Sequence, residues 1–349
     1  MDTVKIKQTL CWIATAVALI ALAACQHDEP GGKPKPVDQR TVLVLNHDGE
    51  IYDQNGELVM QLPDCTYAAE IIADGSDYFV SGVQAKERVG YWKNGKWNTL
   101  HVDFIEDVDR WTYGIAKWDY YIYLLDLPNV LKNSGIFPLE NNHDFIPADH
   151  ALSVSEGKCY VVGYGFGEND DESYYKPILY SNYKDYYKKE FLPMPEGTIT
   201  GEAHAIYSYD RDHTIIGGVI GRMPAVWVDK EYRIYPTTVK LDLDSPQDYG
   251  RVEAIKMGAG HIYGGGWELN EEQKMVATVW TDGVPAHYVS GDAGVSSSQA
   301  VEIFCYDNDV YVLTQEYNSE IDNDITFLWL NGKIIMSYAG IRATGFVVF

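Results

Sequence analysis

Basic residues are scarce in this chain of 349 residues. Lysine and arginine together number 27, aspartate and glutamate number 51, and the formal net charge is −24 at pH 7. Neutralising nucleic-acid phosphates requires clusters of lysine and arginine, and so does electrostatic docking on anionic lipid. The composition therefore argues against a nucleic-acid-binding protein and against membrane association through a basic patch.

Cysteine and the common catalytic motifs are also scarce or missing. The chain has five cysteines, none of them in a CxxC pair, so we predict neither a disulfide framework nor a cysteine-based metal site. Glycine-rich nucleotide loops, the HExxH zinc motif and the GxSxG nucleophile elbow do not occur. We therefore predict no cofactor and no metal.

One long apolar run is present, near the N-terminus. Lys5 and Lys7 precede apolar residues 10–24, and a polar stretch rich in proline and glycine follows at once. The run is shorter than the roughly 20 residues of a membrane-spanning helix. It also ends in small residues, which favours a secretory signal peptide over a retained membrane helix.

The end of this run resembles a known export signal. Leu22-Ala23-Ala24-Cys25 is similar to the bacterial lipoprotein box, in which the signal is cleaved before the cysteine and the thiol is lipidated. Residues 26–29 resemble the acidic patch of Bacteroidetes surface lipoproteins. The resemblance implies a signal peptide at 1–24, and a lipidated Cys25 with a flexible tether at 25–40. It also implies anchoring in the outer membrane, with exposure at the cell surface.

From residue 41 onward the sequence is a series of short strands without helical periodicity. Runs rich in Val, Ile, Tyr and Trp alternate with turns rich in Gly, Asp and Asn, which is typical of a sandwich, a barrel or a propeller. Internal repetition decides among these, because four strands recur about every 40–50 residues, as in propeller blades. The six complete copies begin with Ala69–Gly82, Tyr113–Asp126, His150–Gly165, His204–Gly218, Glu253–Gly266 and Glu302–Gln315.

The two ends of the repeat region complete each other. Residues 41–62 supply three strands and residues 344–349 supply one, and joining them leaves no unpaired sheet edge in the ring. We therefore predict an all-β fold at 41–349, a β-propeller with seven four-stranded blades, one of them closed by the N- and C-terminal strands. If only the complete copies form blades, the propeller has six blades instead of seven. Gly217-Gly218 and Gly264-Gly265 resemble the double glycine of kelch propellers, although the other copies have different pairs there.

Tryptophan recurs at one position of the third strand of the repeat. Sugar binding and packing between blades both use tryptophan, and because the residue repeats in register we favour packing. The residues are Trp92, Trp227, Trp280 and Trp329.

A second repeat position predicts a binding site. The innermost strands of a propeller line its central channel, so the residues that open these strands are expected to form a ring around the channel mouth. Such a ring of carboxylates, imidazoles and hydroxyls suits a cation, a sugar or acid–base chemistry, although a solvated polar lining has the same composition. These openers are Glu70, Tyr113, His150, His204, Glu253, Glu302 and Thr344.

Two hypotheses of function follow. The first, which we favour, is a lipid-anchored extracytoplasmic propeller that binds a glycan or an envelope protein through its loops. Here the resemblance to surface lipoproteins implies polysaccharide capture. The second is a propeller glycosidase or polysaccharide lyase, with Tyr113 or a histidine of the ring removing a proton. The negative charge of the chain opposes the lyase because acidic polysaccharides are repelled.

Overall fold

A computed structural model describes most of the chain. The described residues are 40–85, 88–100, 112–133, 135–140, 144–166, 174–183, 186–239 and 248–349. They form strands β1 to β28 and contain no α-helix. No helix in these ranges is long and apolar enough to cross a membrane. The predicted signal peptide, Cys25 and nearly all of the tether lie outside the described residues.

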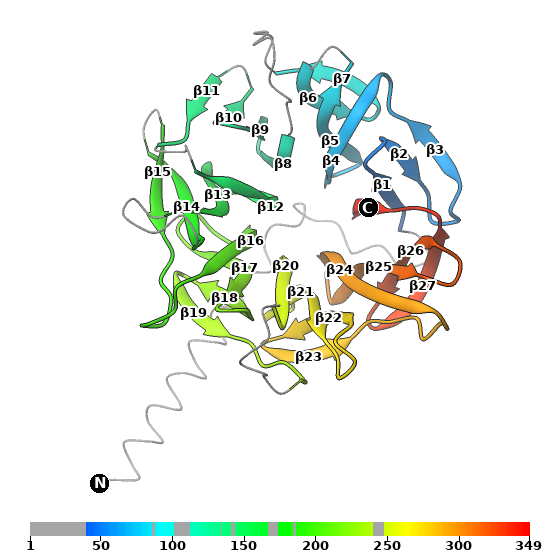
Figure 1. The fold of residues 1–349 in the computed structure, drawn as a ribbon. Coiled ribbons are helices and arrows are strands. Elements are labelled where there is room, and N and C mark those ends of the chain that lie inside the picture. Colours follow the sequence, from blue (N-terminus) through cyan, green and yellow to red (C-terminus); the bar gives the residue numbers. More distant parts are fainter. Residues whose placement is uncertain are drawn as a thin grey trace.

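The strands are arranged as a ring of four-stranded units around a central axis (Figure 1). Five of the sheets have four strands, and the eight-stranded sheet consists of two such units joined by one parallel bridge, His150 to Ala205. The prediction of an all-β propeller is confirmed. In order from the innermost strand outward, the units are β28 (Ala343–Val348), β1 (Val42–Asn46), β2 (Glu50–Tyr52), β3 (Leu58–Gln61); β4 (Cys65–Asp74), β5 (Asp77–Gln84), β6 (Arg88–Lys93), β7 (Lys96–Thr99); β8 (Thr112–Trp118), β9 (Tyr121–Asp126), β10 (Asn129–Lys132), β11 (Gly135–Pro138); β12 (Ile146–Ser155), β13 (Lys158–Gly165), β14 (Lys176–Tyr183), β15 (Tyr186–Phe191); β16 (Gly201–Ser208), β17 (Thr214–Ile220), β18 (Met223–Val228), β19 (Glu231–Ile234); β20 (Gly250–Gly258), β21 (His261–Leu269), β22 (Met275–Thr281), β23 (Val284–His287); β24 (Val295–Tyr306), β25 (Asp309–Asn318), β26 (Asn323–Leu330) and β27 (Lys333–Ala339).

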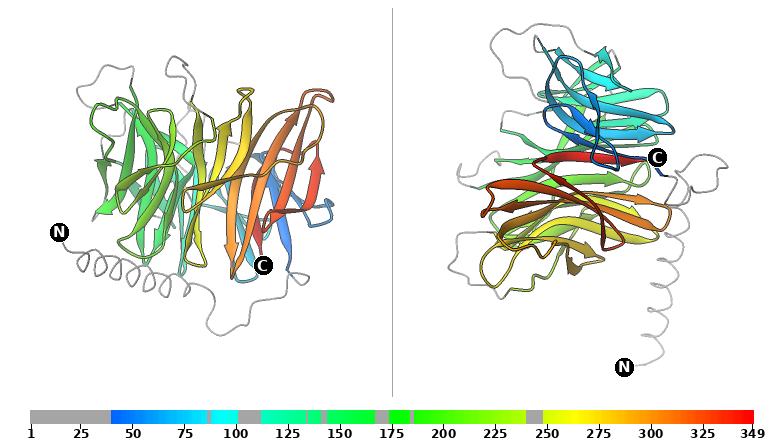
Figure 2. Two further views of the ribbon diagram at one scale, coloured as in Figure 1. Left: turned by 90° about the horizontal axis from the view of Figure 1, so that it is seen from below. Right: turned by 90° about the vertical axis from the view of Figure 1, so that its right-hand side faces the viewer.

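The last strand of the chain closes the ring against the first. β28 pairs antiparallel with β1, from Val42 opposite Val348 to Leu45 opposite Gly345, and Figure 2 shows the two strands side by side. All six residues of β28 are buried. The predicted closure by the two termini is therefore confirmed, and it removes the two free edges that an open ring would present.

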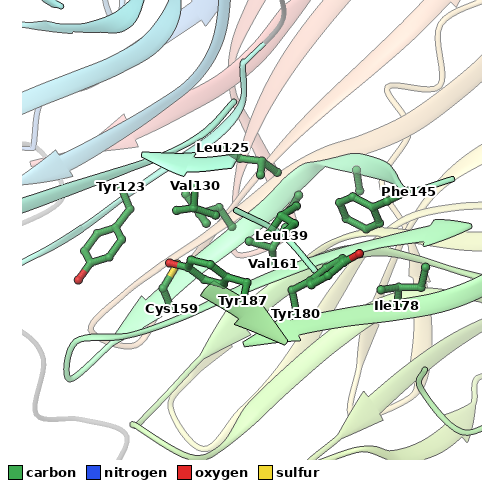
Figure 3. Close-up of a cluster of buried hydrophobic side chains, with 13 residues drawn as sticks. Tyr123, Leu125, Val130, Leu139, Phe145, Cys159, Val161, Ile178, Tyr180 and Tyr187 are labelled. Carbon is green, nitrogen blue, oxygen red and sulfur yellow. The ribbon is translucent and has the colours of Figure 1, made fainter. Parts of the chain in front are cut away.

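The hydrophobic core is divided into clusters that lie between neighbouring units. One cluster joins the β8 and β12 units and contains Tyr123 and Val130 from one side and Val161, Tyr180 and Tyr187 from the other (Figure 3). All five side chains are at most 4% exposed. Because each cluster is shared by two units, the units stabilise one another rather than folding around separate cores.

The repeated tryptophans serve this packing, as predicted. Trp92, Trp227 and Trp280 are fully buried, and Trp329 is 6% exposed. The indole N–H of Trp227 donates to the carbonyl of Pro193 at 2.7 Å, and the other two fully buried indoles likewise donate to a proline carbonyl. These prolines follow the outermost strand of the preceding unit, so each indole ties two units together.

The two faces of the ring differ in the length of their connections. On one face, here called the turn face, two residues join the first strand to the second in most units, for example between β4 and β5 or between β24 and β25. On the opposite face, the loop face, the outermost strand returns to the next unit, and β7 to β8 and β19 to β20 are separated by more than ten residues. Since loops on a rigid scaffold usually carry function, the loop face is the first place to search for a site.

Closure by β28 predicts a large loss of stability when its central side chain is removed. Phe346 is fully buried against Tyr311 and Leu313, so Phe346→Ala is expected to lower the free energy of unfolding by about 3–5 kcal/mol, measured by urea denaturation. The control, Ile335→Ala on the outer strand β27, removes a side chain that is 40% exposed. It should change stability by at most about 0.5 kcal/mol, and an equal effect of both substitutions would contradict the role assigned to β28.

Candidate functional site

Each innermost strand has an irregularity at the opener position. In β16, Ala203 pairs with Gly218 and Ala205 pairs with Gly217, so His204 is left out of the ladder. The other six innermost strands show a register shift that includes or adjoins their opener. A bulge of this kind re-aims the side chain at or beside it.

The double glycines lie opposite these bulges. A Cβ atom on Gly218 would stand 2.0 Å from the carbonyl oxygen of Glu202, and one on Gly266 would stand 1.9 Å from that of Arg251. The close approach of two backbones therefore requires glycine. In the β20 unit the pair opposite the bulge is Gly265 and Gly266, one residue later than the pair proposed from the kelch pattern.

The structure brings most of the predicted ring together around two cavities that meet at His150. A cavity of about 600 Å³ opens towards the turn face and is lined by Glu70, His150 and Glu302 among others; we call it the turn-face basin. A cavity of about 160 Å³ at the other end, the loop-face pocket, is lined by Tyr113, His150, Glu253 and Thr344. His204 lines neither cavity.

His150 crosses the channel and separates the two cavities. Its Nε2 atom lies 3.1 Å from the carbonyl oxygen of Val301, which belongs to the β24 unit on the other side of the ring. Its Nδ1 atom lies 3.6 Å from Oε1 of Glu70. A carbonyl and a carboxylate only accept hydrogen bonds, so this arrangement favours the imidazolium, in which both ring nitrogens carry a proton.

The charge state of His150 and of Glu302 follows from this arrangement. Burial alone lowers the pKa of His150, but Glu70 outweighs it, with help from Glu302 and Asp149, and raises the pKa to about 9. Burial raises the pKa of Glu302 to about 7, against the opposing charges of His150 and Lys256. At neutral pH the middle of the channel thus holds the charged imidazolium of His150 and the partly protonated carboxyl of Glu302.

Two of the predicted ring carboxylates hold neighbouring units together. Oε2 of Glu70 accepts the backbone N–H of Ile115 at 2.8 Å, and Oε2 of Glu302 accepts that of Phe346 at 2.8 Å. In both cases the donor lies two residues after the opener of the next unit. The residue between them is glycine in both; at Gly345 a Cβ atom would lie 2.9 Å from the carboxylate oxygen. These openers therefore have a structural role as well as a place in the channel.

His204 belongs to a separate charged network. Its Nε2 atom lies 3.0 Å from Glu202, its Nδ1 atom lies 3.4 Å from Glu253, and Arg251 is within 4 Å of both carboxylates. Burial alone raises the pKa of Glu202, but the hydrogen bond from His204 and the charge of Arg251 outweigh it and hold the pKa below its usual value. The opener Glu253 thus faces both this network and the loop-face pocket.

A third depression extends the loop-face pocket outward over the β24 unit. Its volume is about 210 Å³, and it shares Gln299, Gln315 and Arg342 with the loop-face pocket. We call this depression the β24 trough. Its remaining lining residues are Met275, Ser297, Ser298, Tyr317 and Asp324.

The trough is lined mainly by polar side chains with planar groups. Nε2 of Gln315 donates to the carbonyl of Ala343, and Nε2 of Gln299 lies 3.5 Å from Oε1 of Gln315, which holds these amides in place. Arg342 is exposed and forms no ion pair with any residue of the described part of the chain. Its guanidinium is therefore available to a ligand.

The openers do not include all the polar side chains that line the loop-face pocket and the trough. Gln299 lies on β24 three residues before the opener Glu302, and Arg342 lies two residues before the opener Thr344, just ahead of β28, so extending the repeat alignment towards the start of each strand finds them. Gln315 comes from the second strand of its unit, where no repeat pattern marks it. Within the described ranges, no group of three or more His, Cys, Asp or Glu side chains is arranged to hold a metal ion.

Comparisons with known proteins identify no family for this chain. No protein-family model matches the sequence, and no curated protein matches it. Among solved structures, a puromycin-hydrolysing peptidase of Mycobacterium tuberculosis aligns at a TM-score of 0.48 with 11% identity, over 78% of this chain and 44% of the peptidase. A variant of AofleA from Arthrobotrys oligospora aligns at 0.43 with 15% identity, over 93% and 95% of the two chains. An α-L-arabinanase of Cellvibrio cellulosa aligns at 0.36 with 8% identity, over 77% and 93%. The chain spans less than half of the peptidase, and these values carry no argument about activity.

The raised pKa values of Glu302 and His150 predict that the stability of the fold falls as the pH rises. The folded state holds protons on Glu302 and His150 at pH values where the unfolded chain has released them, so raising the pH favours unfolding. The contribution of Glu302 is full below pH 4.5 and is lost as the pH rises through about 7. The contribution of His150 to stability is full below pH 6.5 and is lost as the pH rises through about 9.

Urea midpoints measured between about pH 5 and about pH 9 test this prediction. Glu302→Gln keeps an oxygen that accepts the Phe346 N–H but cannot ionise, so it should remove the part of the decline that occurs below pH 7. Glu320→Gln, the same substitution at an exposed position, serves as the control and should leave the profile unchanged. A wild-type midpoint that rises steadily over this range would contradict the assignment.

Proposed function

We propose that the protein is a lipid-anchored, extracytoplasmic binding module that takes up glycan segments along the β24 trough and the loop-face pocket. The observation that carries this proposal is the continuity of the two depressions, which share Gln299, Gln315 and Arg342. Both lie on the face that bears the long connections, the usual place for a binding surface on a rigid scaffold.

The side chains of the trough suit a polyhydroxylated ligand. Amide, guanidinium and carboxylate groups each offer two hydrogen-bonding atoms in one plane, which matches pairs of neighbouring hydroxyls on a sugar ring. Tyr317, at the edge of the trough, is 37% exposed and offers an aromatic face. Each depression is smaller than a pocket for a drug-sized molecule, about 300–1,000 Å³, which suits single rings of an extended chain.

The enzyme hypothesis has less support from the geometry of the ring. Glu70 and Glu302 accept backbone N–H groups, and His150 has a partner at each ring nitrogen. His204 is likewise held between two carboxylates. Residues with these partners are poorly placed to exchange protons with a substrate. We therefore propose binding, and the partner that we favour is a glycan rather than an envelope protein.

The orientation of the module follows from the point where the chain enters the propeller. The guanidinium of Arg40 pairs with Asp309 at 2.7 Å, donates to the hydroxyl of Tyr311 at 2.9 Å and lies over the ring of Tyr306. These partners flank the turn between β24 and β25, on the turn face. A lipid on Cys25, at most about 50 Å away along an extended tether, would place the turn face towards the membrane and the trough away from it.

Glycan binding is tested with an array of polysaccharides and oligosaccharides. Arg342→Gln should weaken binding to the recognised glycan at least tenfold, as expected for the loss of a charged hydrogen bond of about 1.5–3 kcal/mol. Arg233→Gln, the same substitution on the exposed outer strand β19, should bind like the wild type. The proposal fails if no glycan binds, if Arg342→Gln binds as tightly as the wild type, or if a pull-down from envelope extracts captures a protein through the trough instead.

The lipid anchor is tested by cell fractionation. Cys25→Ser is expected to move the protein from the membrane fraction to the soluble fraction, since the thiol that carries the lipid is lost. Cys11→Ser, within the signal segment, provides a matched control that should remain with the membrane. A Cys25→Ser protein that stays in the membrane fraction would refute the anchor without affecting the proposal for the trough.

A further inference from the structure

The turn-face basin is a second cavity that the glycan proposal does not use. Its volume is about 600 Å³, within the range of pockets that enclose a small organic molecule. His150 closes its inner end by reaching Val301 across the channel, so the basin is a cup rather than one end of an open pore. A ligand would enter it only from the turn face.

Charge is distributed unevenly around the wall of the basin. The acidic lining residues Glu70, Asp74, Asp119 and Glu302 come from the β4, β8 and β24 units. The lining residues from β12, β16 and β20 include no aspartate or glutamate among the described residues. Their polar members are His150, Ser153, Ser155, Tyr207, Ser208 and Lys256.

The two lysines of the basin differ in their partners. Lys117 pairs with Asp74 at 2.5 Å and donates to the carbonyl of Asp119, so its charge is neutralised. Lys256 forms no ion pair within the described ranges, and its Nζ atom lies 5.6 Å from the centre of the Tyr207 ring. The charge of Lys256 acts on Glu302, which lines the same basin, but no carboxylate of the described residues lies within ion-pair distance of the ammonium, so it would attract an anion in the basin.

One hydroxyl on the same side lacks a partner. Ser153 and Ser208 are satisfied by each other, with their Oγ atoms 2.8 Å apart and the N–H of Ser208 bonded to Oγ of Ser153. Ser155 is only 3% exposed, and its buried Oγ atom has no hydrogen-bond partner. Buried hydroxyls are nearly always hydrogen-bonded, so this one is an exception, but its oxygen has almost no accessible surface and a ligand in the basin would not contact it.

The rest of the wall is apolar. Trp118 and Phe304 line the outer part of the basin, and Ile72, Val154 and Ile206 are among the aliphatic residues below them. About half of the surface that a ligand would contact is therefore hydrocarbon, which contributes roughly 25 cal/mol for each Å² of apolar surface removed from water. A fully hydrophilic ligand such as a sugar would gain little from it.

We propose that the turn-face basin binds a small organic anion, with its anionic group at Lys256 and its apolar body against Phe304 and Trp118. This site is distinct from the β24 trough in position, in charge and in the chemistry of its lining. The proposal does not depend on glycan binding, and the two can be tested separately with the same set of variants.

The test uses anilinonaphthalene sulfonate, an aromatic anion whose fluorescence increases in an apolar site. The propeller region is titrated, and the bound dye is then competed with phenylbutyrate or with phenylbutylamine, which differ in the sign of their charge. We expect saturable binding of the dye to the wild type and competition by the carboxylate but not by the amine.

Four variants locate the site of dye binding. Lys256→Gln should weaken dye binding at least tenfold, as expected for the loss of a charged partner, and Ser155→Ala, which removes a hydroxyl without accessible surface, should leave dye binding unchanged. Lys158→Gln, on the same face but outside the basin lining and paired with Asp212, should bind like the wild type. Arg342→Gln should also leave dye binding unchanged, and Lys256→Gln should leave glycan binding unchanged.

Several results would overturn the proposal. They are the absence of saturable binding, equal competition by the amine, and wild-type affinity in Lys256→Gln with an unchanged melting temperature. Loss of dye binding in Arg342→Gln but not in Lys256→Gln would place the dye in the trough and would equally refute the basin. None of these outcomes bears on the glycan proposal, whose failure is read from the array alone.

Discussion

The contact of His150 with Val301 across the channel is the interaction on which the division of this propeller depends. It connects units on opposite sides of the ring through one side chain, and Glu70 from a third unit holds the same imidazole. Because both partners only accept hydrogen bonds, the contact favours a charged imidazolium in a buried place. Without it the two cavities would form one channel; with it the molecule has two separate recesses of different polarity.

The polarity of each recess is consistent with the architecture around it. On the loop face, a depression is lined by amides, a guanidinium and carboxylates, which suits hydrogen bonding to a hydrophilic chain. On the turn face, mostly tight turns leave an open cup with aliphatic and aromatic walls. Arg40 fixes the start of the propeller to this second face.

Much of this fold follows from the sequence, because the features concerned repeat. Alternating strands, tryptophans in register and two incomplete ends predict a closed propeller, and the pairing of β28 with β1 confirms the closure. The positions of the ring residues also follow from the repeat, but their roles do not. Glu70 and Glu302 accept N–H groups from the next unit, a contact that depends on bulge geometry. The partner of His150 is a backbone carbonyl, which leaves no mark in the sequence. Arg342 and Lys256 stand out only once their lack of carboxylate partners is seen.

The most direct test of the divided channel is the titration of His150 by NMR with isotope-labelled histidine. The resonances of this residue are identified by their absence from His150→Asn. The account predicts an imidazole that keeps protons on both ring nitrogens until the pH approaches about 9, with Nε2–H protected from exchange by its bond to Val301. Loss of a proton near pH 6.5, the ordinary value for histidine, with free exchange at Nε2, would show that the side chain does not bridge the channel.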